Sequence, residues 1–147
     1  MQNYETEIII NSSAKTVWNI LMDHENYGQW NPFITEIKGL AKEGETLEVT
    51  LEPKGSKAMT MKPKVLTVNA NKEFKWLGNL FIKGLFDGEH YFKIEPIGED
   101  QVKFIHGENF SGLLVKPLLK LVGKSTLEGF IAMNKALKDK IEEFEKA

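Results

Sequence analysis

The chain has 147 residues, of which 41% are apolar and 27% are charged, as in an ordinary globular protein. One hydrophobic core suffices at this length, so we expect a single domain over residues 1–147, with an interior large enough to leave room for a cavity. The composition excludes a disordered chain and a collagen-like repeat. Because the chain has no cysteine, it also excludes a disulfide scaffold and a thiolate metal site.

The charges argue against polyanionic partners. The 19 basic residues, all lysines, and the 21 acidic residues give a formal net charge of -2. Because the chain has no excess of positive charge and no arginine to bind phosphate in a bidentate manner, we expect no nucleic-acid partner. No run reaches the roughly 18 apolar residues of a membrane span, so we expect no stable membrane insertion. The first residues lack a signal-peptide pattern, so we expect a cytoplasmic protein.

The start of the chain predicts a strand followed by two short helices. Residues 7–10 form a β-branched run, and the side chains of residues 11–13 can cap a helix. The helix itself is expected over residues 14–22, where apolar residues recur at helical spacing. Asp23 then begins a second short turn toward Trp30.

Residues 34–111 mostly alternate between apolar and polar side chains, which is typical of strands with one buried face. The alternation is clearest at residues 47–51. Two longer strands are expected over residues 86–96 and 102–110, joined by a turn around residues 98–100. Strands spaced this closely indicate an antiparallel meander.

The last third of the chain changes to helical spacing. Apolar residues recur every three or four positions, which predicts one amphipathic helix over residues 117–144. Pro117 suits its first turn, where a backbone N–H has no helical partner. Such a helix is roughly 42 Å long, enough to lie across a whole sheet.

Polar residues fall on the apolar face of the two longest strands. In strand 86–96 the even positions are apolar except for His90, whereas the odd positions carry all of the formal charges. In strand 102–110, His106 and Glu108 share the even positions with apolar residues. Since alternate side chains of a strand share a face, we expect all of these even positions to point inward.

The turn between these strands decides which polar side chains meet. If it centres on residue 99, His90 lies opposite Glu108, and if it centres on residue 98, His90 lies opposite His106. Opposed side chains are about 5 Å apart at Cβ, so either register predicts a cluster of His90, His106 and Glu108 at one end of an apolar cavity. The cluster can be a satisfied buried network, the partner of a ligand's polar group, or an acid–base pair. A metal site of two histidines and a carboxylate is disfavoured, because His106 and Glu108 are two residues apart on one strand.

Four segments carry a family resemblance: residues 12–21, 23–33, 84–90 and 108–112. They resemble the SRPBCC (START-like or Bet v 1-like) superfamily, in particular its bacterial polyketide cyclase/dehydrase-like branch. The resemblance implies an α+β helix-grip fold, in which a curved antiparallel sheet of about six or seven strands wraps around the long C-terminal helix. Two short helices follow the first strand, and an elongated apolar cavity lies inside.

The resemblance leaves several functions open, because this fold serves many of them. We expect the protein to bind a small hydrophobic molecule (a lipid, a polyketide-like molecule or an aromatic one), without a cofactor or metal and as a monomer or weak homodimer. One alternative is a polyketide cyclase or dehydratase that uses His90, His106 and Glu108 as acid–base groups. Another is a protein-binding module similar to chaperone activators. The candidate ligand-binding residues are Trp76, His90, Phe92, His106, Glu108, Phe110, Phe130 and Met133.

Two further regions of the sequence, residues 111–123 and the segment around the first helices, also allow predictions. Residues 111–123 are rich in leucine and valine. We favour their burial over a movable flap or a contact surface, because large exposed apolar patches are uncommon on soluble monomers. His24 lies in a short polar turn and is expected to be solvated, whereas Trp18 and Trp30 are expected to pack near the first helices.

Overall fold

The computed structural model describes residues 2–80 and 82–146. Its elements in chain order are β1 (Gln2–Ile10), α1 (Ala14–Leu21), the 3-10 helix η1 (His24–Gln29), β2 (Ile34–Lys38), β3 (Glu48–Leu51), β4 (Met59–Met61), β5 (Lys64–Asn69), β6 (Glu73–Leu80), β7 (Phe86–Gly98), β8 (Gln101–Ser111) and α2 (Val115–Lys146).

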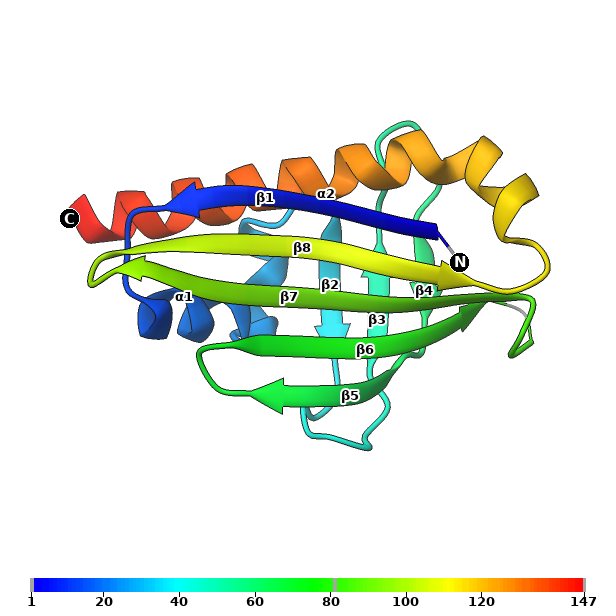
Figure 1. The fold of residues 1–147 in the computed structure, drawn as a ribbon, viewed down its shortest axis with the longest axis horizontal. Helices are drawn as coiled ribbons and strands as arrows, with labels where there is room; N and C mark the ends of the chain where they lie inside the picture. The colour runs from blue at the N-terminus through cyan, green and yellow to red at the C-terminus, as the bar shows by residue number, and fades with distance from the viewer. Residues whose placement is uncertain (1, 81, 147) are drawn as a thin grey trace.

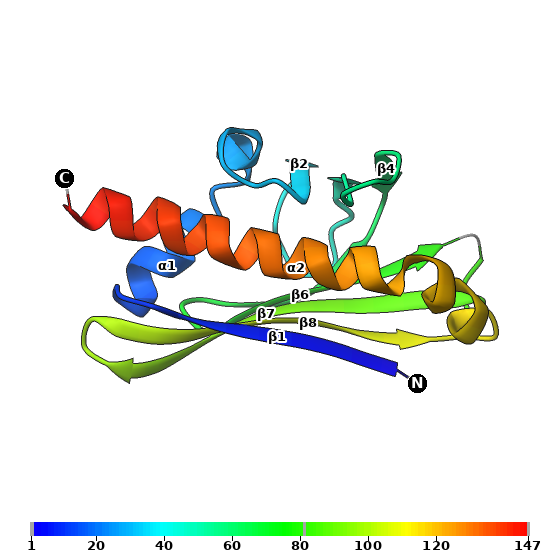
Figure 2. The same cartoon turned by 90° about the horizontal axis from the view of Figure 1, so that it is seen from above.

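The strands form two antiparallel sheets that face each other across α2. The larger sheet has five strands in the order β1-β8-β7-β6-β5, and the smaller has three in the order β2-β3-β4. Figure 1 shows the strands of the smaller sheet running across the direction of the long strands, and Figure 2 shows α2 between the two layers. This arrangement confirms the predicted α+β helix-grip, with the strands divided between two sheets.

The predicted boundaries differ from the observed ones at strand and helix ends. The first strand begins at Gln2, earlier than the predicted residue 7, because β1 pairs with β8 along its whole length, from Gln2 opposite Phe110 to Ile10 opposite Val102. Such long-range pairing leaves no local signal. The helix α1 begins as predicted, with the Ser13 hydroxyl accepting the Thr16 N–H at 3.2 Å.

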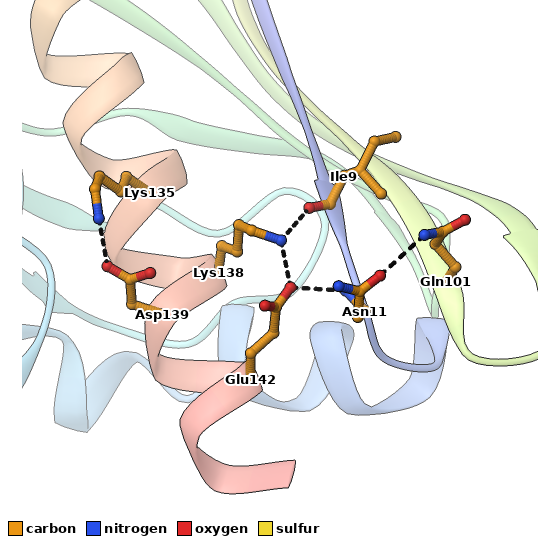
Figure 3. Close-up of polar contacts among 7 residues, drawn as sticks. All are labelled: Ile9, Asn11, Gln101, Lys135, Lys138, Asp139 and Glu142. Atoms are coloured by element: carbon orange, nitrogen blue, oxygen red, sulfur yellow. Dashed lines mark hydrogen bonds and ion pairs between the residues drawn. The ribbon is translucent and has the colours of Figure 1, made fainter. Parts of the chain in front are cut away.

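The C-terminal half of α2 is tied to the beginning of the chain. Lys138 donates to the Ile9 carbonyl at 2.8 Å and pairs with Glu142, and Glu142 accepts the Asn11 N–H at 3.0 Å (Figure 3). Gln101, at the start of β8, donates to the Asn11 side chain at 2.9 Å. These contacts hold this half of the helix against the large sheet.

Residues around α1 and η1 pack against the core, with one correction to the expectations. Trp18 is 9% exposed and Trp30 packs against the core cluster, as predicted. His24 is not solvated: its ring lies 5.1 Å from that of Tyr27 and 5.4 Å from that of Phe74. Burial lowers the pKa of His24 to about 4, against the opposing effect of Asp23. The polar sequence neighbours of His24 gave no sign of the contact with Phe74, which is 50 residues further along the chain.

Candidate functional site

The pairing of β7 with β8 determines which polar side chains meet on the inner face of the large sheet. His90 lies opposite Glu108, and Phe92 lies opposite His106. This is one of the two predicted registers, the one whose turn centres on residue 99. Both histidines are buried, whereas the Glu108 side chain is 13% exposed.

Five side chains form a continuous polar chain through the core. Glu108 Oε1 lies 3.3 Å from His90 Nδ1, and His90 Nε2 lies 2.7 Å from His106 Nε2. His106 Nδ1 lies 2.9 Å from Asn134 Oδ1 on α2, and Asn134 Nδ2 donates to Thr6 Oγ1 at 2.7 Å. The Thr6 hydroxyl then donates to the His106 carbonyl at 2.9 Å. The predicted cluster is therefore present, extended by Asn134 and Thr6, which the sequence patterns did not single out.

The hydrogen bonds that link these five side chains have a defined donor-to-acceptor direction. The His106 carbonyl can only accept, so the Thr6 hydroxyl donates to it and accepts from Asn134 Nδ2. The Asn134 oxygen therefore faces His106 Nδ1, which carries a proton. In a neutral His106 ring, Nε2 is then an acceptor for the N–H of His90 Nε2. One proton remains, between His90 Nδ1 and Glu108 Oε1.

The surroundings of His106 favour its neutral form. Burial is the main cause that lowers the pKa of His106 well below its usual 6.5, and the nearby His90 adds to the effect. Hydrogen bonds with Asn134 and the Phe130 backbone act in the opposite direction but are weaker. A neutral His106 can accept the His90 N–H, as the direction of the chain requires.

Most of the predicted ligand-binding residues belong to the packed core. The His106 ring stacks on Phe130 with centroids 4.3 Å apart, and the His90 ring lies 5.0 Å from that of Trp76. The predicted residues that do not line the apolar cavity described below are Trp76, His90, Phe92, His106, Phe130 and Met133. Alternation identified the inward face of the four strand residues, and helical spacing that of Phe130 and Met133. At these positions the inward faces of the sheet and of α2 pack against each other.

An apolar cavity of about 220 Å³ lies between the two sheets, beside the N-terminal half of α2. Glu108 and Phe110 are the predicted site residues that line it. The complete wall consists of Phe33, Leu51, Pro53, Met59, Met61, Gly78, Asn79, Phe86, Gly88, Glu108, Phe110, Leu118, Val122 and Thr126. Sequence reasoning missed the contribution of the small sheet, although the alternation of Met59 and Met61 indicated a strand with one apolar face.

A glycine makes room for the carboxylate at the cavity wall. A Cβ atom on Gly88 would lie 2.0 Å from Glu108 Oε2, closer than any real contact. The carboxyl group therefore lies over the Gly88 backbone, with Oε1 turned to His90 and Oε2 on the Gly88 side. Gly88 itself lines the cavity, so Oε2 is at its wall.

The leucine-rich segment 111–123 is only partly buried, contrary to the expectation of burial. Val115 is buried and Leu118 lines the cavity, whereas Leu113 and Leu121 are more than 80% exposed. Leu113 precedes α2, and helical geometry from Val115 onward turns Leu121 to the outer face, which composition alone does not reveal. The segment forms one wall of the cavity and part of the surface beside it.

The two sheets gripping α2 and the internal apolar cavity define the START-like, or SRPBCC, class of protein. Within it, the chain belongs to the family described as polyketide cyclase / dehydrase and lipid transport, whose family model matches residues 1–142.

Solved structures share the fold at low identity. A START superfamily protein from Mycobacterium smegmatis is 24% identical, with a TM-score of 0.74 over 97% of this chain and 98% of that one. The ZhuI aromatase/cyclase from Streptomyces sp. R1128 is 11% identical, with a TM-score of 0.74 over 96% and 93%. Norcoclaurine synthase from Thalictrum flavum, solved with dopamine and hydroxybenzaldehyde, is 18% identical, with a TM-score of 0.73 over 97% and 87%.

No curated protein matches the chain. Among the residues that the structure describes, no helix is long and apolar enough to cross a membrane. Within the same residues, no group of three or more histidine and acidic side chains could hold a metal ion.

Proposed function

We propose that the protein binds a small hydrophobic molecule in the cavity between the two sheets. The observation that carries this proposal is an apolar space whose wall, over the described residues, contains one ionisable group, Glu108. Binding sites for small molecules commonly combine an apolar wall with a few polar groups that orient the ligand. The family description, which includes lipid transport, supports the same type of ligand.

The size and the wall of the cavity favour a compact aromatic or polyketide-like ligand over a long-chain lipid. A volume of about 220 Å³ is below the roughly 300 to 1,000 Å³ typical of ligand pockets. The rings of Phe33, Phe86 and Phe110 are all on the wall, where they can pack against a flat ligand.

Titration with 2-naphthol, followed by its fluorescence, tests the proposal. Thr126→Trp should fill the cavity and weaken binding at least tenfold, because Thr126 is on its wall. Leu121→Trp is the matched control: it lies on the same helix but is 81% exposed, and it should bind as the wild type does. Absence of naphthol binding to the wild type, or equal affinities of the two variants, would contradict binding in this cavity.

The Glu108–His90 pair supports a second candidate, acid–base catalysis of a cyclisation or dehydration. A carboxyl group 3.3 Å from an imidazole, at the wall of an apolar cavity, can exchange a proton with a bound substrate. Turnover of a small polyketone should then disappear in Glu108→Gln, with the fold intact by circular dichroism. Unchanged turnover would remove Glu108 from such a mechanism.

A further inference from the structure

We propose that the cavity selects hydrophobic molecules whose polar group donates a hydrogen bond, such as a phenol, over molecules of the same shape that can only accept one. This inference rests on the proposed binding function and specifies the chemistry of the ligand. It follows from the direction of the hydrogen-bonded chain that ends at Glu108.

The buried end of the hydrogen-bonded network determines where the protons lie between His106, His90 and Glu108. The His106 carbonyl, the Thr6 hydroxyl and the Asn134 amide together place a proton on His106 Nδ1. A neutral His106 then accepts from His90 Nε2, and His90 Nδ1 is the atom that faces Glu108 Oε1. The Asn134 amide cannot pass a proton onward, so proton exchange with solvent or ligand occurs at the Glu108 end.

Glu108 Oε2 is an acceptor wherever the shared proton resides. If the proton is on His90, Glu108 is a carboxylate and both its oxygens accept. If the proton is on Oε1, it points to His90, and Oε2 is the carbonyl oxygen of a carboxylic acid, which also accepts. In both cases the atom on the Gly88 side of the carboxyl group offers a lone pair and no proton.

Oε2 is also available to a ligand. Among the described residues, no side chain or backbone group forms a hydrogen bond with it, and the Glu108 side chain is 13% exposed. The other polar wall groups are less selective than Oε2: Asn79 already donates one amide N–H to Asp87 at 2.8 Å, and the Thr126 hydroxyl can donate or accept. A ligand group that donates to Oε2 gains a hydrogen bond, whereas a ligand acceptor at the same place faces the lone pairs of Oε2 and is repelled.

The test compares the affinities of 2-naphthol and 2-methoxynaphthalene, which differ in one donor. At pH 7, where a phenol keeps its proton, the wild type should bind 2-naphthol at least tenfold more tightly by calorimetry. The methoxy compound is the more hydrophobic, so partitioning alone predicts the opposite order. Equal affinities, or tighter binding of 2-methoxynaphthalene, would overturn the inference while leaving the binding function intact. Failure of both probes to bind would refute the binding function, and the inference with it.

Variants at Glu108 separate hydrogen-bond direction from charge. In Glu108→Gln, the side-chain amide should donate to His90 Nδ1 and leave its oxygen at the cavity wall, so the preference for 2-naphthol should persist. In Glu108→Leu the preference should fall below threefold. Leu121→Ala, at an exposed position of α2 outside the cavity wall, should keep it. Loss of the preference in Glu108→Gln, or its survival in Glu108→Leu, would contradict the proposed role of Oε2.

Discussion

The Nε2 atoms of His90 and His106 lie 2.7 Å apart inside the core, a distance that requires one of them to carry a proton and the other a lone pair. Because Asn134 accepts the Nδ1 proton of His106 and burial favours the neutral ring, the lone pair belongs to His106 and the proton to His90. Protonating His106 would turn two N–H groups toward each other for as long as His90 keeps its own Nε2 proton. Burial disfavours the His106 cation, so His106 is the acceptor of the pair.

We expect His106 to remain neutral, with its proton on Nδ1, as the pH falls from 8 through 6.5, where an ordinary histidine becomes protonated. The reason is burial, which holds the pKa of His106 well below 6.5. Nitrogen-15 NMR of the imidazole rings distinguishes the two tautomers and the cation, and it should show an unchanged Nδ1–H signal over this range. A His106 that titrates near pH 6.5, or that carries its proton on Nε2, would contradict the direction assigned to the chain.

Asn134→Leu should destabilise the protein by about 1 to 3 kcal/mol, because it leaves the His106 Nδ1–H without a buried acceptor and removes a donor to Thr6. Urea unfolding measures the loss. Lys135→Leu, the next residue on the same helix, is the control: its ion pair with Asp139 is exposed, and its loss should cost less than about 1 kcal/mol. Equal losses in the two variants would argue against a role for Asn134 in orienting His106.

Gly88→Ala should weaken both stability and ligand binding. The added Cβ would displace Glu108 Oε2 from its place over the backbone, and overpacking of this kind costs about 1 to 3 kcal/mol. Urea unfolding and 2-naphthol titration should both register the change. Gly98→Ala, on the same strand but with nothing within 4 Å of the added atom, should resemble the wild type. If Gly88→Ala binds 2-naphthol with wild-type affinity, ligand binding does not require the Glu108 carboxylate at this position.

Alternation along the two longest strands predicted the inward faces, and the turn between them limited the pairing to two registers. These are local properties, so His90, His106 and Glu108 could be found from the sequence. Asn134 and Thr6 could not, because they meet His106 only through the packing of α2 and β1 against β8.

The cavity wall was predicted least well, since alternation says which face is inward but not what covers it. Phe92 and Phe110 share the same face of neighbouring strands, yet Phe92 packs in the core and Phe110 lines the cavity. The difference arises from where α2 and the small sheet lie along the strands. That placement depends on long-range contacts such as the one between Phe33 and Phe130, whose centroids are 5.8 Å apart.

His24 should make the protein less stable as the pH falls from about 6.5 to about 4. Its pKa is 6.5 unfolded and about 4 folded, so between these values the unfolded state binds more protons. The stability contributed by the neutral, buried ring is complete above pH 6.5 and is lost as the pH falls toward 4. A shift of this size corresponds to roughly 3 kcal/mol.

His24→Phe isolates this contribution, because phenylalanine retains the ring contacts with Tyr27 and Phe74 but cannot be protonated. The free energy of unfolding, measured in urea at several pH values from 4.5 to 7, should depend less steeply on pH in this variant than in the wild type. His106 acts in the same direction, so some dependence should remain. Glu25→Gln, an exposed neighbour, should keep the wild-type slope. An unchanged slope in His24→Phe would mean that His24 is accessible to protons in the folded state.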